Sequence, residues 1–148
     1  MKNAKSEKTR IMIFGTFDIV HPGHLHLFQQ ARALVGKKRQ PFLIVSLARD
    51  KNVARIKGKK PRNSESKRLK QVSVSEGVDK AVLGAVRNYM LGIIKEQPDI
   101  IALGYDQTAY VENLHRDLKK AGLKTKVVRL KSHKPHLYKT SLIKPRKV

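Results

Sequence analysis

The sequence predicts an α/β fold, in which a doubly wound parallel sheet of five strands carries helices on both faces. Short apolar runs alternate along the chain with segments whose apolar residues have helical spacing. Several of these runs are apolar throughout, as is typical of strands that are covered on both faces. The length of 148 residues suits one domain. We therefore expect a single domain over residues 10–148, preceded by a disordered basic tail at residues 1–9.

In the first half of the chain, the apolar run at residues 11–14 is the first predicted strand, and it ends at Gly15. A helix is predicted over residues 25–35, where the apolar positions have helical spacing and a glycine follows. Residues 42–48 form the second apolar run and the second strand. Residues 51–62 have little apolar content and many basic side chains, so we expect a mobile basic loop there.

In the second half, Asn63 or Ser64 can cap a helix that extends to about Val74. The remaining elements are predicted in the order strand 80–83, helix 88–97, strand 100–103, helix 110–121 and strand 126–130. Glycines or a proline follow most of these segments and explain their ends. In such sheets, ligands bind outside the carboxyl ends of the strands, near the point where the strand order reverses.

Composition narrows the function. The chain has 33 Lys and Arg against 11 Asp and Glu, a net charge of +22, which favours an anionic partner, although a general compositional bias is the plainer interpretation for most surface lysines. The absence of cysteine excludes disulfides, thiolate metal sites and thiol nucleophiles. No apolar run approaches the roughly 20 residues of a membrane helix, and no signal peptide is evident, so we expect a cytoplasmic protein that does not bind membranes.

The most informative motif is Gly-Thr-Phe-Asp-Ile-Val-His-Pro-Gly-His at residues 15–24. Gly15 ends the first strand, where a phosphate can approach the backbone. His21 and His24 follow at the expected start of a helix, whose N–H groups and positive dipole end attract an anion. The motif therefore predicts a phosphate site. The alternatives are a capped helix with incidental histidines, or a zinc site that includes Asp18; since no further ligand is evident, we predict no metal held by protein side chains.

These ten residues resemble the signature of the cytidylyltransferase-like nucleotidyltransferase superfamily, and the resemblance covers residues 10–143. Within the superfamily, segments 48–50, 56–61, 78–84 and 98–107 are most similar to the archaeal-type FAD synthases, also called FMN adenylyltransferases. The resemblance implies a Rossmann-like fold of the HxGH nucleotidyltransferase type. It also implies transfer of AMP from ATP to FMN, with release of pyrophosphate.

The resemblance further implies roles for single residues. His21 and His24 would stabilise the transition state, and a loop lysine, best matched by Lys57 or Lys59, would contact the triphosphate; each lysine can instead belong to a solvated charge run. Arg68 matches an arginine near the nucleotide, with a surface arginine as the alternative. The full prediction is catalytic His21, His24 and Lys57, and nucleotide-binding Gly15, Thr16, Phe17, Asp18, Gly23, Lys59, Arg68, Gly104, Asp106, Thr140 and Ser141.

Two parts of this set lie late in the chain. Asp106 follows the fourth strand, where its carboxylate can accept a hydrogen bond from a ribose or base, or can simply form a turn. Thr140 and Ser141 resemble the family's second signature, a hydroxyl-rich helix start that forms a phosphate cradle. There Lys139 replaces the usual serine, and Lys134 is the nearest equivalent of the usual upstream arginine.

In the implied reaction, the acceptor phosphate attacks the α-phosphorus of the nucleotide, a step that depends on positioning and charge stabilisation. Mg²⁺ would be held mainly by substrate phosphates and water. One alternative is a CTP-dependent transferase that acts on glycerol 3-phosphate or a similar phosphorylated alcohol. Another is a basic nucleic-acid-binding protein on the same fold, which the charge favours and the aromatic content of 5% disfavours. Relatives often form dimers, so a homodimer is an open alternative.

Overall fold

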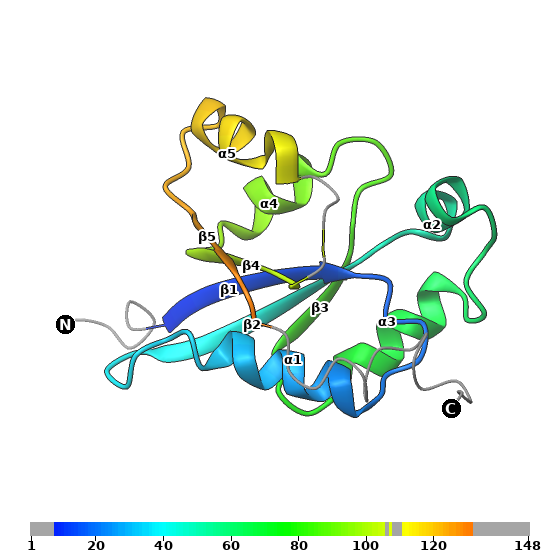
Figure 1. Ribbon diagram of the computed structural model, residues 1–148, viewed down its shortest axis with the longest axis horizontal. Helices are drawn as coiled ribbons and strands as arrows, with labels where there is room; N and C mark the ends of the chain where they lie inside the picture. Colours follow the sequence, from blue (N-terminus) through cyan, green and yellow to red (C-terminus); the bar gives the residue numbers. More distant parts are fainter. Residues whose placement is uncertain (1–7, 106, 108–110, 132–148) are drawn as a thin grey trace.

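The computed structural model describes residues 8–105, 107 and 111–131, and its centre is a parallel sheet (Figure 1). Within these residues the sheet has five strands in the order β3-β2-β1-β4-β5. The strands are β1 (Lys8–Gly15), β2 (Gln40–Leu47), β3 (Lys80–Leu83), β4 (Ile100–Leu103) and β5 (Lys126–Arg129). The predicted parallel five-stranded sheet is therefore confirmed, and the expected starts and ends of β3 and β4 are matched.

The strand order reverses at β1. The chain builds β2 and β3 to one side of β1, then crosses back to place β4 and β5 on the other side. The carboxyl ends of β1 and β4 are thus neighbours at the point where the two halves of the sheet diverge. Sheets of this kind bind ligands in the crevice at that point.

Helices cover both faces of the sheet, as predicted (Figure 1). One face carries α1 (Pro22–Arg32) and α3 (Glu65–Ser73), and the other carries α4 (Met90–Glu96) and α5 (Val111–Lys120). A further helix, α2 (Asp50–Lys57), lies beyond the carboxyl ends of the strands. No helix in the described ranges is long and apolar enough to cross a membrane.

The mobile loop predicted over residues 51–62 is wrong for its first half, because residues 50–57 form α2. The helix has an acidic residue in its first turn and ends at Gly58, whose φ of 82° is the left-handed conformation that glycine adopts without strain. Asn52 and Val53 are its buried residues. With so few apolar residues facing the core, the helix gives no apolar periodicity to read from the sequence.

Two other boundaries differ from the prediction. β1 begins at Lys8 rather than Ile11, because Lys8 and Thr9 pair with Gln40 and Pro41 of β2. These two residues are therefore not part of a disordered tail, and residues 1–7 lie outside the described part of the chain. α1 begins at Pro22 rather than Leu25, because His21 is its N-cap.

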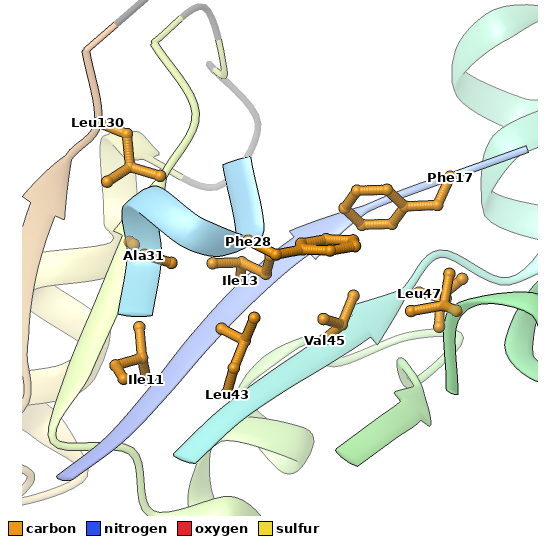
Figure 2. Packing of buried hydrophobic residues seen from close by; sticks show 11 residues of the cluster. Ile11, Ile13, Phe17, Phe28, Ala31, Leu43, Val45, Leu47 and Leu130 are labelled. Atoms are coloured by element: carbon orange, nitrogen blue, oxygen red, sulfur yellow. The ribbon is translucent and has the colours of Figure 1, made fainter. Parts of the chain in front are cut away.

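The core has two layers, one on each face of the sheet. Alternate residues of β1 point to opposite faces, so Ile11 and Ile13 join one layer and Met12 joins the other. Figure 2 shows the first layer, in which Phe28 of α1 packs over β1 and β2. The first layer also includes Ala31, Leu43, Val45, Leu47 and Val72, and the second includes Ile44, Met90, Ile93, Ile101, Leu103, Leu114 and Leu118.

A buried carboxylate ties α4 to the sheet at the amino ends of its strands. The Glu96 side chain is only 3% exposed, and it pairs with Arg10 of β1 at 2.9 Å and with Lys80 of β3 at 3.0 Å. Arg10 also donates through Nε to the Glu96 carbonyl at 2.8 Å. One carboxylate thus joins two strands that β2 separates.

We predict that Glu96→Ala lowers the free energy of unfolding by about 1–3 kcal/mol, measured by urea denaturation. The loss is moderate because Arg10 and Lys80 are partly exposed, so water can solvate their charges once the carboxylate is removed. Glu112→Ala on the exposed surface of α5 is the matched control, with an expected change within about 0.5 kcal/mol. Equal effects of the two substitutions would contradict the role assigned to Glu96.

Candidate active site

The predicted motif at residues 15–24 leaves β1 at its carboxyl end and enters α1. Gly15 is the last residue of β1, and its carbonyl accepts a hydrogen bond from Ala48 N–H at 2.9 Å, just beyond β2. Because β1 and β4 are neighbours, the motif lies beside the end of β4, where Gly104 follows. The structure therefore brings the histidine motif after β1 and the segment after β4 together at the point where the strand order reverses.

His21 and His24 form a reciprocal cap on α1. The Nδ1 atom of His21 accepts a hydrogen bond from Gly23 N–H at 3.1 Å, and Nδ1 of His24 accepts one from His21 N–H at 3.3 Å. Their rings stack, with centroids 3.7 Å apart and an interplanar angle of 21°. This is a capping box in which histidines replace the usual hydroxyl and carboxyl residues. The spacing HxGH is thus explained by local geometry, which sets both rings side by side.

The cap changes how α1 can meet an anion. Pro22 has no N–H, Gly23 N–H is bound by His21, and the N–H groups of His24 and Leu25 donate to the His21 carbonyl at 2.8 and 3.2 Å. The expectation that backbone N–H groups here would bind a phosphate directly is therefore not supported. The groups at this helix end that carry the prediction of a phosphate site are therefore the two imidazole rings, which lie at the positive end of the helix dipole.

Both histidine rings are neutral in this setting. Because Nδ1 of each ring accepts a backbone N–H, the hydrogen of the neutral ring resides on Nε2. Burial, followed by the nearby His21, lowers the pKa of His24 to about 4, although a hydrogen bond with the Ile19 backbone opposes the shift. Burial also lowers the pKa of His21. At neutral pH the site therefore presents two neutral imidazole rings rather than two imidazolium cations.

Phe17 is part of the packing beneath the histidines. Its side chain is buried, and its ring meets the His24 ring edge-on, with the two ring centroids 5.0 Å apart. The centroid of its ring lies 5.6 Å from that of Phe28 (Figure 2). Its φ of 49° is in the left-handed region, which a bulky residue adopts only where the surroundings hold it there. The Phe17 ring thus packs against His24, and the predicted nucleotide contact of Phe17 stays a prediction.

Gly15 is required by this packing. A Cβ at position 15 would lie 2.6 Å from a ring carbon of Phe17. The structure shows that an aromatic ring of the same chain approaches this glycine, and the predicted approach of a phosphate to its backbone stays a prediction. Thr16 lies between the two, and its carbonyl accepts a hydrogen bond from Arg68.

Asp18 links the motif to the segment before α3. Its carboxylate accepts hydrogen bonds from the N–H groups of Arg62 at 2.7 Å and Asn63 at 2.8 Å, and the Asn63 amide donates to the Asp18 carbonyl at 2.7 Å. Both carboxylate oxygens are thus engaged by backbone. Among the described residues no group of three His, Cys, Asp or Glu side chains could hold a metal ion, so the structure offers nothing that supports the zinc alternative.

Arg68 is fully buried and bonded within the protein. Its side chain is 0% exposed, and its guanidinium donates to Thr16 O, Asn63 O and Asp50 Oδ1 at distances of 2.9, 3.1 and 2.7 Å. The predicted direct contact with a nucleotide is therefore not supported. Lys57 and Lys59, in contrast, are exposed at the end of α2, on either side of the turn at Gly58.

Sequence reasoning missed two residues at the end of β4. The Gln107 side-chain oxygen accepts from Gly104 N–H at 3.1 Å, and its amide donates to Phe14 O at 3.4 Å, which bridges β4 to β1. Arg129 of β5 donates to the carbonyls of Gly104 and Gln107 at 2.7 and 2.8 Å. The only signal in the sequence was the position of Gln107 after a buried strand. Asp106, Thr140 and Ser141 lie outside the described residues.

Comparisons with known proteins agree with this arrangement. Residues 12–146 match the profile of the cytidylyltransferase-like family. A protein named FAD synthase from Methanosarcina barkeri is 46% identical over 122 residues, which is 82% of this chain and 83% of the relative. One from Thermoplasma acidophilum is 38% identical over 91% of each chain. A crystal structure named as a lipopolysaccharide core biosynthesis protein from Thermoplasma volcanium superposes with a TM-score of 0.74 at 38% identity, covering 84% of this chain and 98% of that one.

We predict that Gly15→Ala destabilises the protein by about 1–3 kcal/mol, because the added methyl group overlaps the Phe17 ring. Gly36→Ala is the matched control: a Cβ there meets nothing within 4 Å. That substitution should be neutral or slightly stabilising. Thermal unfolding of the two variants tests the difference, and a Gly15→Ala variant as stable as Gly36→Ala would contradict the proposed packing.

The lowered pKa of His24 predicts a pH dependence of stability. Between pH 6.5 and about 4 the unfolded chain binds a proton at this position and the folded chain does not, so stability present above pH 6.5 is lost as the pH falls. Between neutral pH and about pH 5, His24→Asn should therefore lose less unfolding free energy than the unmodified protein. Nitrogen-15 NMR of the ring gives the pKa directly, and a value near 6.5 would contradict the prediction.

Proposed function

The chain belongs to the cytidylyltransferase-like family, and we propose that within it this protein is an FAD synthase that transfers AMP from ATP to FMN and releases pyrophosphate. The carrying observation is the pair of stacked, neutral histidines that caps α1 at the switch point of the sheet. Identity of 38–46% to named FAD synthases over most of the chain supports the choice of ATP and FMN.

The proposed chemistry is a single displacement at phosphorus. A phosphate oxygen of FMN forms a bond to the α-phosphorus of ATP, and the bond from that phosphorus to the bridging oxygen of the β-phosphate breaks. Both electrons of the broken bond leave with pyrophosphate. The FMN phosphate is already ionised near neutral pH, so the step needs little base catalysis and depends on alignment and charge stabilisation.

The histidines are suited to the charge that develops at the α-phosphate. Their rings are held in place by the helix cap before any substrate arrives, and preorganised polar groups of this kind stabilise a transition state without further rearrangement. Lys57 and Lys59 would then neutralise the departing pyrophosphate from the end of α2. Thr140 and Ser141 are proposed for its far end, and Asp106 for the ribose or base.

The site fits a Mg²⁺ ion that binds together with the nucleotide. The carboxylates of Asp18 and Asp50 are engaged in hydrogen bonds, so the ion would be held mainly by phosphate oxygens and water. It would neutralise part of the triphosphate charge. The surplus of 33 basic over 11 acidic residues also attracts both anionic substrates to the protein.

A product assay tests the proposal. Purified protein is mixed with Mg²⁺ and either ATP and FMN or CTP and glycerol 3-phosphate, and FAD and pyrophosphate are followed. FAD formation from the first pair is expected. Product from the second pair only would show that the protein is a cytidylyltransferase that uses the same mechanism. Without product from either pair, salt-sensitive binding of random DNA would favour the nucleic-acid alternative.

We predict that His24→Ala lowers kcat by about 10²–10³-fold, because one preorganised polar ring at the transition state is lost. His115→Ala, at an exposed position of α5, is the matched control and should leave kcat unchanged. Circular dichroism confirms that both variants are folded. A folded His24→Ala enzyme with normal turnover would remove this histidine from the mechanism.

A further inference from the structure

Arg68 is the largest fully buried side chain in the described structure, and it is charged. Arginine is rarely buried completely unless its donors are all engaged, because an unpaired guanidinium loses its hydration without compensation. Its acceptors come from three separate parts of the chain: Thr16 in the histidine motif, Asp50 in the first turn of α2, and Asn63 just before α3. One planar group therefore joins the histidine motif to α2.

The first turns of α2 and α3 also hold each other. Asp50 N–H donates to Glu65 Oε1 at 2.8 Å, and Glu65 N–H donates to Asp50 Oδ2 at 3.1 Å. Arg49 extends this clasp, pairing with Glu65 at 2.9 Å and donating to Gly84 O at 2.8 Å. The Asp50 carboxylate thus receives Arg68 on one oxygen and the α3 backbone on the other.

The attachment of α2 depends on these polar contacts more than on apolar packing. Val53 is its one buried apolar residue, while Ile56 is 65% exposed. Burial raises the pKa of Asp50, but hydrogen bonds from Arg68 and the Glu65 backbone, with the charges of Arg68 and Lys60, outweigh it and lower the pKa overall. The carboxylate therefore stays ionised at neutral pH and keeps its contact with Arg68.

We propose that Arg68 is a positioning residue, which holds α2 in register with the histidine motif and so places Lys57 and Lys59 for the reaction. This inference rests on the proposed function, because it assigns the lysines to the departing pyrophosphate. Arg68 then acts through the lysines and makes no contact with the nucleotide. Lysine cannot replace it, since a single ammonium group does not reproduce the planar set of donors that reaches three acceptors.

A double-mutant cycle separates this role from a general structural one. Arg68→Lys should lower kcat by about 10²-fold with a much smaller change in the KM for ATP, because misplaced catalytic groups cost turnover. In a Lys57→Ala/Lys59→Ala background the same substitution should change kcat by less than about threefold, since the groups it positions are gone. The proposal is overturned if the loss is equal in both backgrounds. A raised KM with normal kcat would instead indicate direct contact with the nucleotide.

Hydrogen exchange without substrates gives a readout that does not depend on activity. Arg68→Lys should speed amide exchange in residues 50–57, while β1 and β2 remain protected as in the unmodified protein. Arg55→Lys, an exposed position on α2, is the matched control and should change nothing. Unchanged exchange in α2 would overturn the proposal whether or not the protein makes FAD. Faster exchange in a protein that makes no FAD would reject the proposed function but would still support the role of Arg68 in holding α2.

Asp50→Asn provides a second route if Arg68→Lys does not fold. It keeps the guanidinium and the shape of the partner, and removes the charge that holds α2. The same increase in exchange over residues 50–57 and the same loss of kcat are expected. A folded Asp50→Asn protein with normal exchange and turnover would contradict the proposal.

Discussion

The structure depends on the exit of the chain from β1, the strand at which the order of the sheet reverses. β1 is covered on both faces, so the chain continues from it only beyond the carboxyl edge of the sheet. The turn that follows packs against Phe28. Phe17 fills that space in a left-handed conformation, and its ring excludes any side chain at Gly15. The cap of α1 and the stacked histidines are built on this turn. Packing in the core therefore determines where the chemical groups lie.

The same turn is tied to distant segments by buried polar groups. The Asp18 carboxylate accepts hydrogen bonds from the backbone N–H groups of Arg62 and Asn63. The Arg68 guanidinium donates one to the Thr16 carbonyl. In a chain with only 11 acidic residues, several carboxylates serve such internal contacts, among them Asp50, Glu65 and Glu96. These carboxylates thus stabilise the fold through internal contacts, while basic side chains such as Lys57 and Lys59 are exposed. That division suits a site for two anionic substrates.

Much of the fold could be predicted because the signals were local. The bounds of β3 and β4 follow from short apolar runs that end at glycines, and Ser64 caps α3 as its side chain suggested. α2 was missed because its stabilising partner, Glu65, lies 15 residues away in the sequence. Gln107 and Arg129 were missed for the same reason, since their acceptors, Phe14 and Gly104, lie 93 and 25 residues away in the sequence.

By itself, the sequence determined the class of the fold, the family and the position of the histidine motif, because these are carried by periodicity and by ten consecutive residues. Only the tertiary structure decided the strand order, the neutral state of the histidines and the place of Arg68. Those properties depend on burial and on hydrogen bonds between residues far apart in the chain. A residue type shows that a side chain can donate or carry charge, and the fold decides whether its partner is a substrate or the protein itself.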